Sequence, residues 1–174
     1  QPVIDGFAAA GTPYVGVIYA GLMLTSDGPR LIEYNARFGD PEAQAVLPLV
    51  ETDLAELALA AALGDVSSVP LVTRTQSSVT VVAAAAGYPV TPESGARIVD
   101  QVDDDEAFNH AHDGVALRFD SGVSTDDAGD RVAGGRVLAV TGVGQDLREA
   151  RRIAYARMDA IEFAGMQVRR DIAW

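Results

Sequence analysis

Two short apolar runs flank a cluster of turn-forming residues near the start of this 174-residue chain. The first run extends from Tyr14 to Leu24 and the second from Arg30 to Asn35. The segment between them, Thr25–Pro29, is rich in residues that favour turns. The pattern therefore predicts a β-hairpin, in which side chains alternate between two faces.

Helix signals follow the hairpin and return near the end of the chain. Asp40–Glu42 suits a helix start with Asp40 as the N-cap, and Pro48 should stop that helix early. Helices are also predicted over 53–64 and 146–161, because each begins with an aspartate followed three residues later by a glutamate. The predicted buried stripe of the last helix is Leu147, Ala150, Ala154, Met158 and Ile161.

The second half of the chain reads as short strands with turns between them. The strand candidates are Ser78–Ala86, Ala96–Val99, Gly114–Phe119 and Gly134–Val143, and 126–130 is a predicted hairpin tip. A stretch without periodicity around Ser67–Ser68 and Pro70 marks a boundary.

The charge balance limits the partners that this chain can bind. Its formal net charge is −12, which repels nucleic acid and anionic membranes. There is no cysteine, so disulfides, thiolate metal sites and thiol catalysis are excluded from this sequence. All 13 of the lysine and arginine positions are arginines, and without lysine the chain has no Schiff-base chemistry and no lysine that could clamp ATP.

The second apolar run ends in the most informative window of the sequence, Glu-Tyr-Asn-Ala-Arg-Phe-Gly-Asp-Pro-Glu. Residues i and i+2 of a strand share a face, so Glu33 and Asn35 present a carboxylate and an amide carbonyl side by side. Such hard oxygen donors can share a Mg²⁺ that keeps water and phosphate oxygens in the rest of its shell. Arg37 continues the same face and could hold a phosphate or a carboxylate.

Other interpretations compete with this one. Glu33 and Asn35 could lie on an ordinary solvated strand face, although that would not explain the arginine and the Asp-Pro-Glu that follow. His110, His112 and Asp113 could supply zinc ligands, or they could lie on a solvated surface. The aspartates of 126–130 lack the spacing of a calcium loop, which favours a hairpin tip.

With these motifs in view, the sequence resembles the C-terminal part of phosphoribosylamine–glycine ligase (glycinamide ribonucleotide synthetase), an ATP-grasp family of purine synthesis. Small departures from the family's pattern include Tyr34, Val90 and 120–123. The resemblance extends over the whole chain, in the family's order. It rests on Tyr14–Met23, Ile32–Glu42, Gly87–Pro89, Gly134–Leu138 and Phe163–Ile172.

The resemblance implies a set of site residues and a reaction. Glu33 and Asn35 would be ligands of Mg²⁺ or Mn²⁺ at the ATP phosphates, and Arg37 and Asp40 would lie on the phosphate and substrate side. The family's ligase joins glycine to 5-phosphoribosylamine with ATP as co-substrate, through a glycyl phosphate. No protein nucleophile is needed, which suits a chain without lysine or cysteine.

The resemblance also implies an α+β fold and a domain organisation. Residues 1–65 would end an ATP-grasp module of antiparallel strands and helices, 66–77 would be a linker, and 78–174 a small mixed α/β C-terminal domain. The family's N-terminal domains and its lysine-bearing ATP clamps would precede Gln1. We therefore expect this fragment to be inactive alone, as part of a cytoplasmic enzyme that binds neither membranes nor nucleic acid.

Two alternatives stay open at this level. Another ATP-grasp ligase or a carboxylase would share the Glu-x-Asn strand, but would lack the Phe-Gly-Asp-Pro-Glu that follows it. A non-catalytic binding module would also fit a chain without a nucleophile. The sequence that encodes the protein upstream of Gln1 would distinguish these possibilities.

Overall fold

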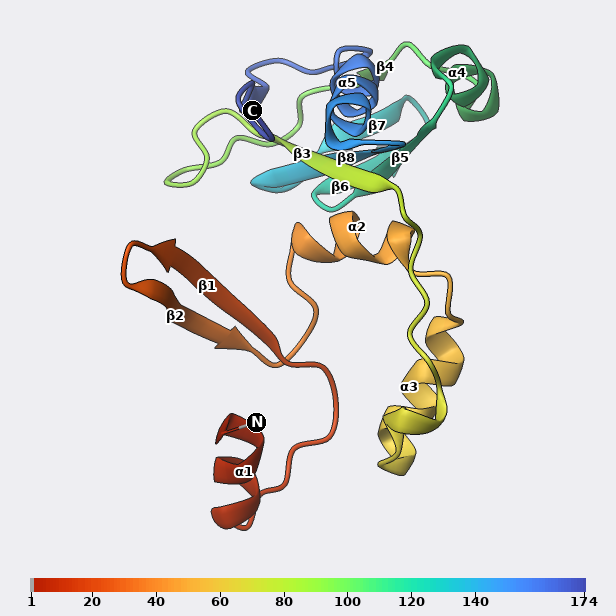
Figure 1. Cartoon of the computed structure of the whole chain (residues 1–174). Helices are drawn as coiled ribbons and strands as arrows, with labels where there is room; N and C mark the ends of the chain where they lie inside the picture. Colours follow the sequence, from red (N-terminus) through yellow and green to blue (C-terminus); the bar gives the residue numbers. More distant parts are fainter. Residues whose placement is uncertain (1) are drawn as a thin grey trace. The chain divides into compact units, whose positions relative to one another are not determined.

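The computed structural model describes residues 2–174 (Figure 1). The chain forms two compact units: Gln1–Asp40 with Val50–Thr73, and Pro41–Leu49 with Arg74–Trp174. Both combine helices with antiparallel strands, so the α+β prediction is confirmed. The predicted domain limits of 1–65, 66–77 and 78–174 stay a prediction. Within residues 2–174, no helix has the length and apolarity needed to cross a bilayer.

The first unit contains the predicted hairpin. β1 (Tyr19–Thr25) and β2 (Gly28–Asn35) pair antiparallel, with one irregularity of register. The first strand begins later than predicted, because residues 14–18 form a loop. In that loop the hydroxyl of Tyr14 donates to the main-chain carbonyl of Val17 at 2.8 Å. The hairpin itself is confirmed.

Helices complete the first unit: α1 (Pro2–Ala9), α3 (Leu54–Leu63) and the 3₁₀ turn η2 (Val66–Ser68). The start of α3 follows its sequence signal, because the Asp53 carboxylate accepts hydrogen bonds from two main-chain N–H groups of the first turn. The helix ends at Gly64, which has a left-handed φ of 83°. The capping prediction is confirmed.

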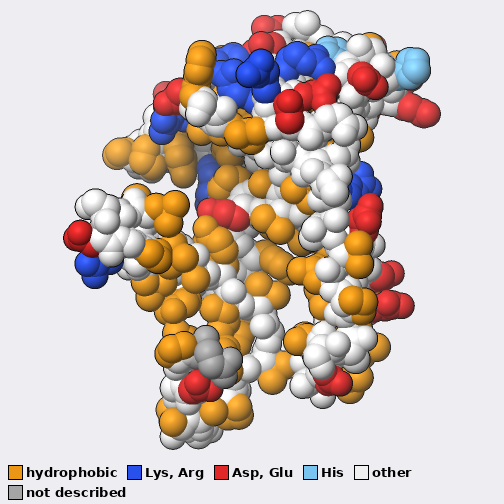
Figure 2. Space-filling view, viewed as in Figure 1, with side chains coloured by type: hydrophobic (Ala, Val, Ile, Leu, Met, Phe, Trp, Pro, Cys, Tyr) orange, Lys and Arg blue, Asp and Glu red, His pale blue; other side chains and the backbone are white. Residues whose placement is uncertain are grey.

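Much apolar surface of the first unit faces outward. Side chains of the hairpin are exposed on both faces, with Leu24 82% and Ile32 64% exposed. Figure 2 shows hydrophobic side chains gathered over this unit, whereas most charged side chains in the view lie on the second unit.

The second unit begins with α2 (Glu42–Val46) and the 3₁₀ turn η1 (Leu47–Leu49), so the predicted stop at Pro48 is confirmed. The prediction that Asp40 caps α2 is wrong. The N-cap is Pro41, with φ −95° and ψ 16°, and no side chain bonds to the helix start. The helix starts one residue later than predicted, because Pro41 does not yet have helical dihedrals.

A four-stranded antiparallel sheet organises the rest of the second unit. The strand order is β10-β3-β8-β5. The strand that begins at Arg136, β8, therefore lies between β3 and β5, which both precede it in sequence. Three of the predicted strands are thereby confirmed within one or two residues. The bounds are β3 (Ser77–Ala84), β5 (Val115–Asp120), β8 (Arg136–Gly144) and β10 (Gln167–Val168).

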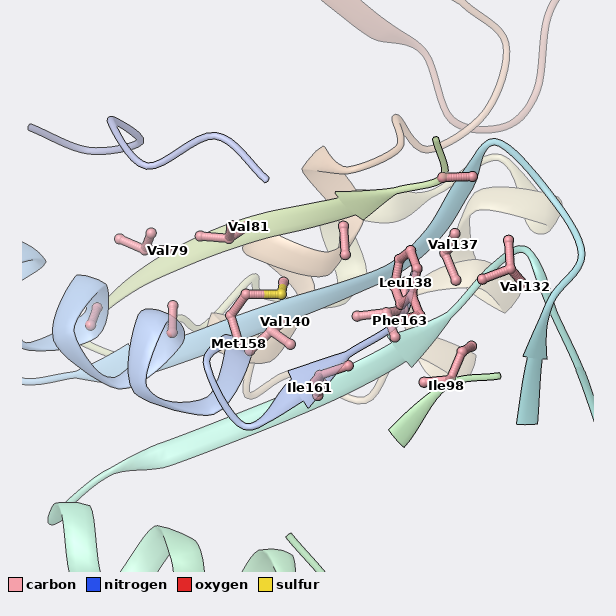
Figure 3. Close-up of a cluster of buried hydrophobic side chains, with 14 residues drawn as sticks. Val79, Val81, Ile98, Val132, Val137, Leu138, Val140, Met158, Ile161 and Phe163 are labelled. Atoms are coloured by element: carbon pink, nitrogen blue, oxygen red, sulfur yellow. The ribbon is translucent and has the colours of Figure 1, made fainter. Parts of the chain in front are cut away.

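One face of this sheet is covered by α5 (Leu147–Met158), and the core lies between them (Figure 3). A Cβ on Gly142 would stand 2.2 Å from the carbonyl oxygen of Ala150, so glycine lets the helix lie directly on β8. The prediction for this helix is wrong at both ends, because Leu147 is 52% exposed and the helix ends at Met158. Ile161 is buried as predicted, but it lies beyond the helix, in the short strand β9 (Ile161–Glu162). The same helix buries a charged residue, Arg157, which is 2% exposed.

The opposite face of the sheet is partly covered by α2. The Ser78 hydroxyl donates to the carbonyl of Ala45 at 2.6 Å, and the Thr141 hydroxyl donates to the carbonyl of Gln44 at 2.9 Å. The hydroxyl of Thr80 bonds to that of Thr141 across the two strands. Polar side chains of the sheet therefore bind the main chain of α2.

Short elements surround the sheet. The predicted tip at 126–130 is confirmed as the turn between β6 and β7. Ala96–Val99 is mostly irregular, because only its last residue enters a strand. The bounds are β4 (Val99–Asp100), α4 (Asp105–His112), β6 (Val123–Asp126), β7 (Gly129–Val132) and β9 (Ile161–Glu162).

Candidate functional site

The hairpin brings Glu33 and Asn35 together at the end of β2. The amide nitrogen of Asn35 donates to the Glu33 carboxylate at 2.9 Å, so both side chains leave the same face of the strand. Glu33 is exposed and Asn35 is half-buried. Two adjacent oxygen-bearing side chains are thus held at an open surface by strand alternation alone.

Arg37 does not extend this face by alternation, because β2 ends at Asn35. Its guanidinium Nη1 donates to the main-chain carbonyl of Phe38 at 2.8 Å, and the side chain is exposed. Asp40 is half-buried and is the last residue of the first unit. The roles of Arg37 and Asp40 on the phosphate and substrate side stay a prediction.

Phe38, which follows the polar residues Glu33, Asn35 and Arg37, lies in apolar surroundings. Its ring lines an apolar hollow of about 590 Å³ inside the first unit, together with the inner face of α3. The rest of the lining consists of Val15, Gly16, Val17, Leu54, Leu57, Ala58, Ala61, Ala62, Val66, Val69 and Leu71. The chain just beyond Asn35 therefore lies at the edge of this apolar hollow, with Phe38 49% exposed.

Sequence reasoning missed a contact made by Tyr14. The single hydroxyl proton of Tyr14 is shared between the carbonyl oxygen of Val17, at 2.8 Å, and that of Ala36, at 3.2 Å. The residue after Asn35 is therefore tied to a loop some twenty positions earlier in the chain. The available signal was a tyrosine at the start of Tyr14–Met23, a run that resembles the family.

The other candidate metal ligands do not converge. Within residues 2–174, no group of three histidines or carboxylates is placed to hold a metal ion. The ring of His112 bonds to the carbonyl of Phe108 at 2.9 Å and stacks on that residue's ring, with centroids 4.0 Å apart. Asp126 pairs with Arg131, and Asp130 pairs with Arg118. His112, Asp126 and Asp130 therefore have structural partners within the protein.

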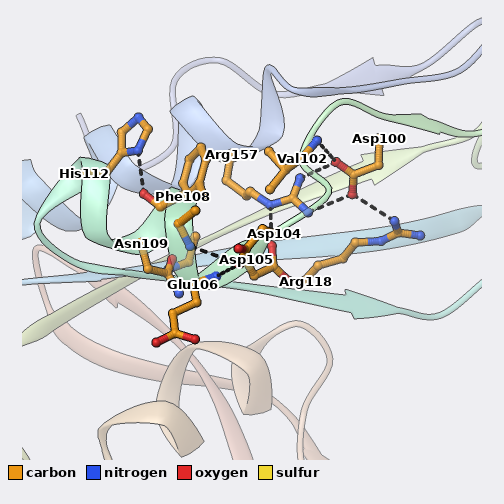
Figure 4. A network of polar contacts seen from close by, with 12 residues as sticks. Asp100, Val102, Asp104, Asp105, Glu106, Phe108, Asn109, His112, Arg118 and Arg157 are labelled. Carbon is orange, nitrogen blue, oxygen red and sulfur yellow. Dashed lines mark hydrogen bonds and ion pairs between the residues drawn. The ribbon is translucent and has the colours of Figure 1, made fainter.

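The strongest electrostatic cluster lies in the second unit (Figure 4). Asp100 accepts two hydrogen bonds of 2.7 Å from Arg157 and one of 3.0 Å from Arg118. Arg118 also binds Asp120 and Asp130. Burial acts to raise the pKa of Asp100, but hydrogen bonds from Arg157 and a main-chain N–H outweigh it, so this pKa lies below its usual value. The cluster joins α5 to β4 and β5.

In comparison with known proteins, two family models match two successive parts of the chain. The family model described as phosphoribosylglycinamide synthetase, C domain, matches residues 78–174. The model described as phosphoribosylglycinamide synthetase, ATP-grasp (A) domain, matches residues 1–43. The window that holds Glu33 and Asn35 lies inside the second match.

Individual relatives agree with the family models. The chain is 45% identical to phosphoribosylamine–glycine ligase of Caulobacter vibrioides and 46% identical to that of Streptomyces coelicolor, over 99% of its length in both cases. A crystal structure of phosphoribosylamine–glycine ligase from Thermotoga maritima matches with a TM-score of 0.80 and 35% identity over 96% of the chain. The chain spans only 39% to 41% of the length of these relatives.

Proposed function

Because this chain belongs to the phosphoribosylglycinamide synthetase family, we propose that it carries part of a ligase that joins glycine to 5-phosphoribosylamine. ATP would be the co-substrate, with ADP and phosphate as products, in purine synthesis. The whole reaction is a proposal, since the chain spans about two fifths of its relatives. The family matches favour this activity over an ATP-grasp carboxylase and over a non-catalytic module.

The observation that supports the proposal most directly is the Glu33–Asn35 pair. A carboxylate and an amide carbonyl are hard oxygen donors, and they suit Mg²⁺ or Mn²⁺. The pair is open to solvent and supplies only two side chains, which leaves the remaining positions of the ion to water and phosphate oxygens. Asn35 would have to turn its carbonyl oxygen toward the ion, because its amide nitrogen now faces Glu33.

The proposed reaction has two steps. A glycine carboxylate oxygen bonds to the γ-phosphorus while the bond to the ADP oxygen breaks. The amine nitrogen of the ribosylamine then bonds to the acyl carbon, phosphate leaves with the acyl C–O electron pair, and the nitrogen loses a proton. A bound divalent ion would neutralise phosphate charge in the first step.

The residues of this chain would orient the reactants. Glu33 and Asn35 would fix the position of the phosphates, which supplies much of the catalysis in phosphoryl transfer. Arg37 would turn its guanidinium from the Phe38 carbonyl to a phosphate oxygen, where a charged acceptor binds it more strongly. Asp40 would lie on the substrate side. A cytoplasmic location is part of the proposal, and the cysteine-free composition is compatible with it.

The test is a ligase assay on the full-length protein that carries this chain. We expect ADP release that requires both glycine and 5-phosphoribosylamine, together with a product whose mass equals the joined substrates less water. ATP turnover that requires bicarbonate instead would favour the carboxylase alternative. A protein that binds the substrates and never hydrolyses ATP would favour the binding module.

A further inference from the structure

Hydroxyl groups of the four-stranded sheet bind α2, the helix that follows the motif of Glu33, Asn35 and Asp40. This helix lies against the face of the sheet opposite α5 (Figure 1). We propose that Ser78, Thr80 and Thr141 form a hydroxyl clamp on α2 that positions Asp40 for the reaction. The proposal rests on the proposed function, in which Asp40 lies on the substrate side.

A proline explains why α2 needs a hydroxyl donor. In an α-helix each carbonyl accepts from the N–H four residues later, and the residue four positions after Gln44 is Pro48, which has no N–H. The N–H of Leu47 donates to the carbonyl of Ala43. The Thr141 hydroxyl lies 2.9 Å from the Gln44 carbonyl oxygen and donates to it. A side chain of the sheet therefore supplies the hydrogen bond that Pro48 cannot.

The hydrogen bonds of the hydroxyl clamp have a fixed direction. A hydroxyl has one proton, and Thr141 donates its proton to Gln44. Thr80, whose hydroxyl oxygen is 2.7 Å away on the paired strand, must therefore donate to Thr141. Thr141 is fully buried. A valine at this position would keep the shape of the side chain and remove both hydrogen bonds, in a place where water does not reach the side chain.

Ser78 adds a second attachment. It lies two residues before Thr80 on β3, so both side chains project from the same face of the sheet. The Ser78 hydroxyl donates to the carbonyl of Ala45 at 2.6 Å, next to the carbonyl of Gln44 that Thr141 binds. Two successive carbonyls of α2 thus accept hydrogen bonds from two paired strands, β3 and β8. The helix can neither turn nor slide along its axis without breaking one of these bonds.

A stiff stretch of main chain joins the hydroxyl clamp to the motif. Asp40 precedes Pro41, and Pro41 precedes Glu42, the first residue of α2. The proline ring restricts φ of Pro41 and disfavours the helical conformation of Asp40, so this pair of residues has few conformations. Fixing α2 therefore restricts the direction in which the Asp40 carboxylate leaves the main chain. A displacement of about 1 Å in a site can lower the rate about a hundredfold.

The test makes two measurements on variants of the full-length protein. In hydrogen exchange followed by mass spectrometry, Thr141→Val and Ser78→Ala should each speed exchange in peptides that cover 42–49 by about tenfold, the effect of one lost hydrogen bond. In the ligase assay each should lower kcat/KM about tenfold, whereas Thr141→Ser, which keeps the hydroxyl, should retain most of the activity. Ser78 is half-buried, so Ser78→Ala tests the hydroxyl clamp with less risk to folding than Thr141→Val.

The matched control is Thr125→Val. It makes the same chemical change at an exposed threonine of β6, whose hydroxyl binds Asp130 and not α2. It should change neither the exchange of 42–49 nor kcat/KM. A double-mutant cycle then separates positioning from a loss of stability. If the hydroxyl clamp acts through Asp40, Thr141→Val should lower kcat/KM by less than about twofold in the Asp40→Asn background.

The outcomes separate the hydroxyl clamp from the proposed function. Unchanged exchange in both Thr141→Val and Ser78→Ala, or an equal increase in Thr125→Val, would overturn the hydroxyl clamp. Ligase activity with unchanged kcat/KM in both variants would refute the positioning role and leave the function standing, and so would a further tenfold loss in the Asp40→Asn background. Faster exchange in a protein that has no ligase activity would refute the proposed function and leave the hydroxyl clamp standing.

Discussion

Replacing Asp100 with asparagine should destabilise the second unit. Its carboxylate binds Arg157 through both oxygens at 2.7 Å, and the side chain of Arg157 is only 3% exposed. Asp100→Asn preserves the shape and removes the charge, so the guanidinium stays buried with a neutral amide. The partner that it retains is Asp105, at 3.2 Å, whose side chain is 60% exposed.

The expected size follows from this geometry. Removing one partner of a buried ion pair typically costs about 3–5 kcal/mol. Because Asp105 still neutralises part of the charge of Arg157, we expect the lower end, about 3 kcal/mol. The midpoint of urea unfolding should then fall by about 1–3 M, given the usual range of denaturant slopes.

The assay is urea unfolding of the chain, followed by circular dichroism and by the fluorescence of its single tryptophan, Trp174. The matched control is Asp159→Asn. Asp159 binds Arg170 where both side chains are 57% exposed, and an exposed pair is worth about 0–1 kcal/mol. The two variants make the same chemical change and differ in burial.

The pH dependence gives an independent check. The pKa of Asp100 lies below its ordinary value of 3.8, so its contribution to stability is present above that value and is lost as the pH falls below it. The difference between the native protein and Asp100→Asn should therefore shrink below about pH 4. If Asp100→Asn lost no more stability than Asp159→Asn, or if the difference were constant from pH 7 to 3, the reasoning would be refuted.

Three further predictions concern the hairpin, the fragment and the core. In the full-length protein, Glu33→Ala and Asn35→Ala should lower kcat in a Mg²⁺ titration more than they raise KM, with stability changed by about 0.5 kcal/mol or less; Glu56→Ala, another exposed glutamate, should leave kcat unchanged. The isolated chain should bind Mg²⁺-ATP more weakly than about 1 mM by calorimetry, because it has no lysine, and tighter binding would contradict this. Gly142→Ala should cost about 1–3 kcal/mol or more in thermal melts, because a Cβ would stand 2.2 Å from a carbonyl oxygen of α5, whereas Gly6→Ala, with open space around it, should cost little.

Local features of this protein could be predicted from the sequence because their causes are local. The caps at Asp53 and Asp146 were predictable, since a carboxylate reaches only N–H groups two or three residues away. The hairpin and the pairing of Glu33 with Asn35 followed from a turn cluster and from strand alternation. The wrong prediction at Asp40 also has a local cause. The φ and ψ of Pro41 are not helical, so α2 starts one residue later than predicted.

Features that join distant segments were decided by the tertiary structure. The helical periodicity predicted that Leu147 is buried, and it did not predict that Arg157 is. Arg157 can be buried because it binds Asp100, which lies 57 residues earlier in the chain. Arg136, Ala84 and Gln167 lie side by side only because strands β8, β3 and β10 are neighbours in the sheet. Strand order depends on how much apolar surface the whole sheet buries against α5. That buried surface comes from distant segments together, so it cannot be predicted from a short stretch of sequence.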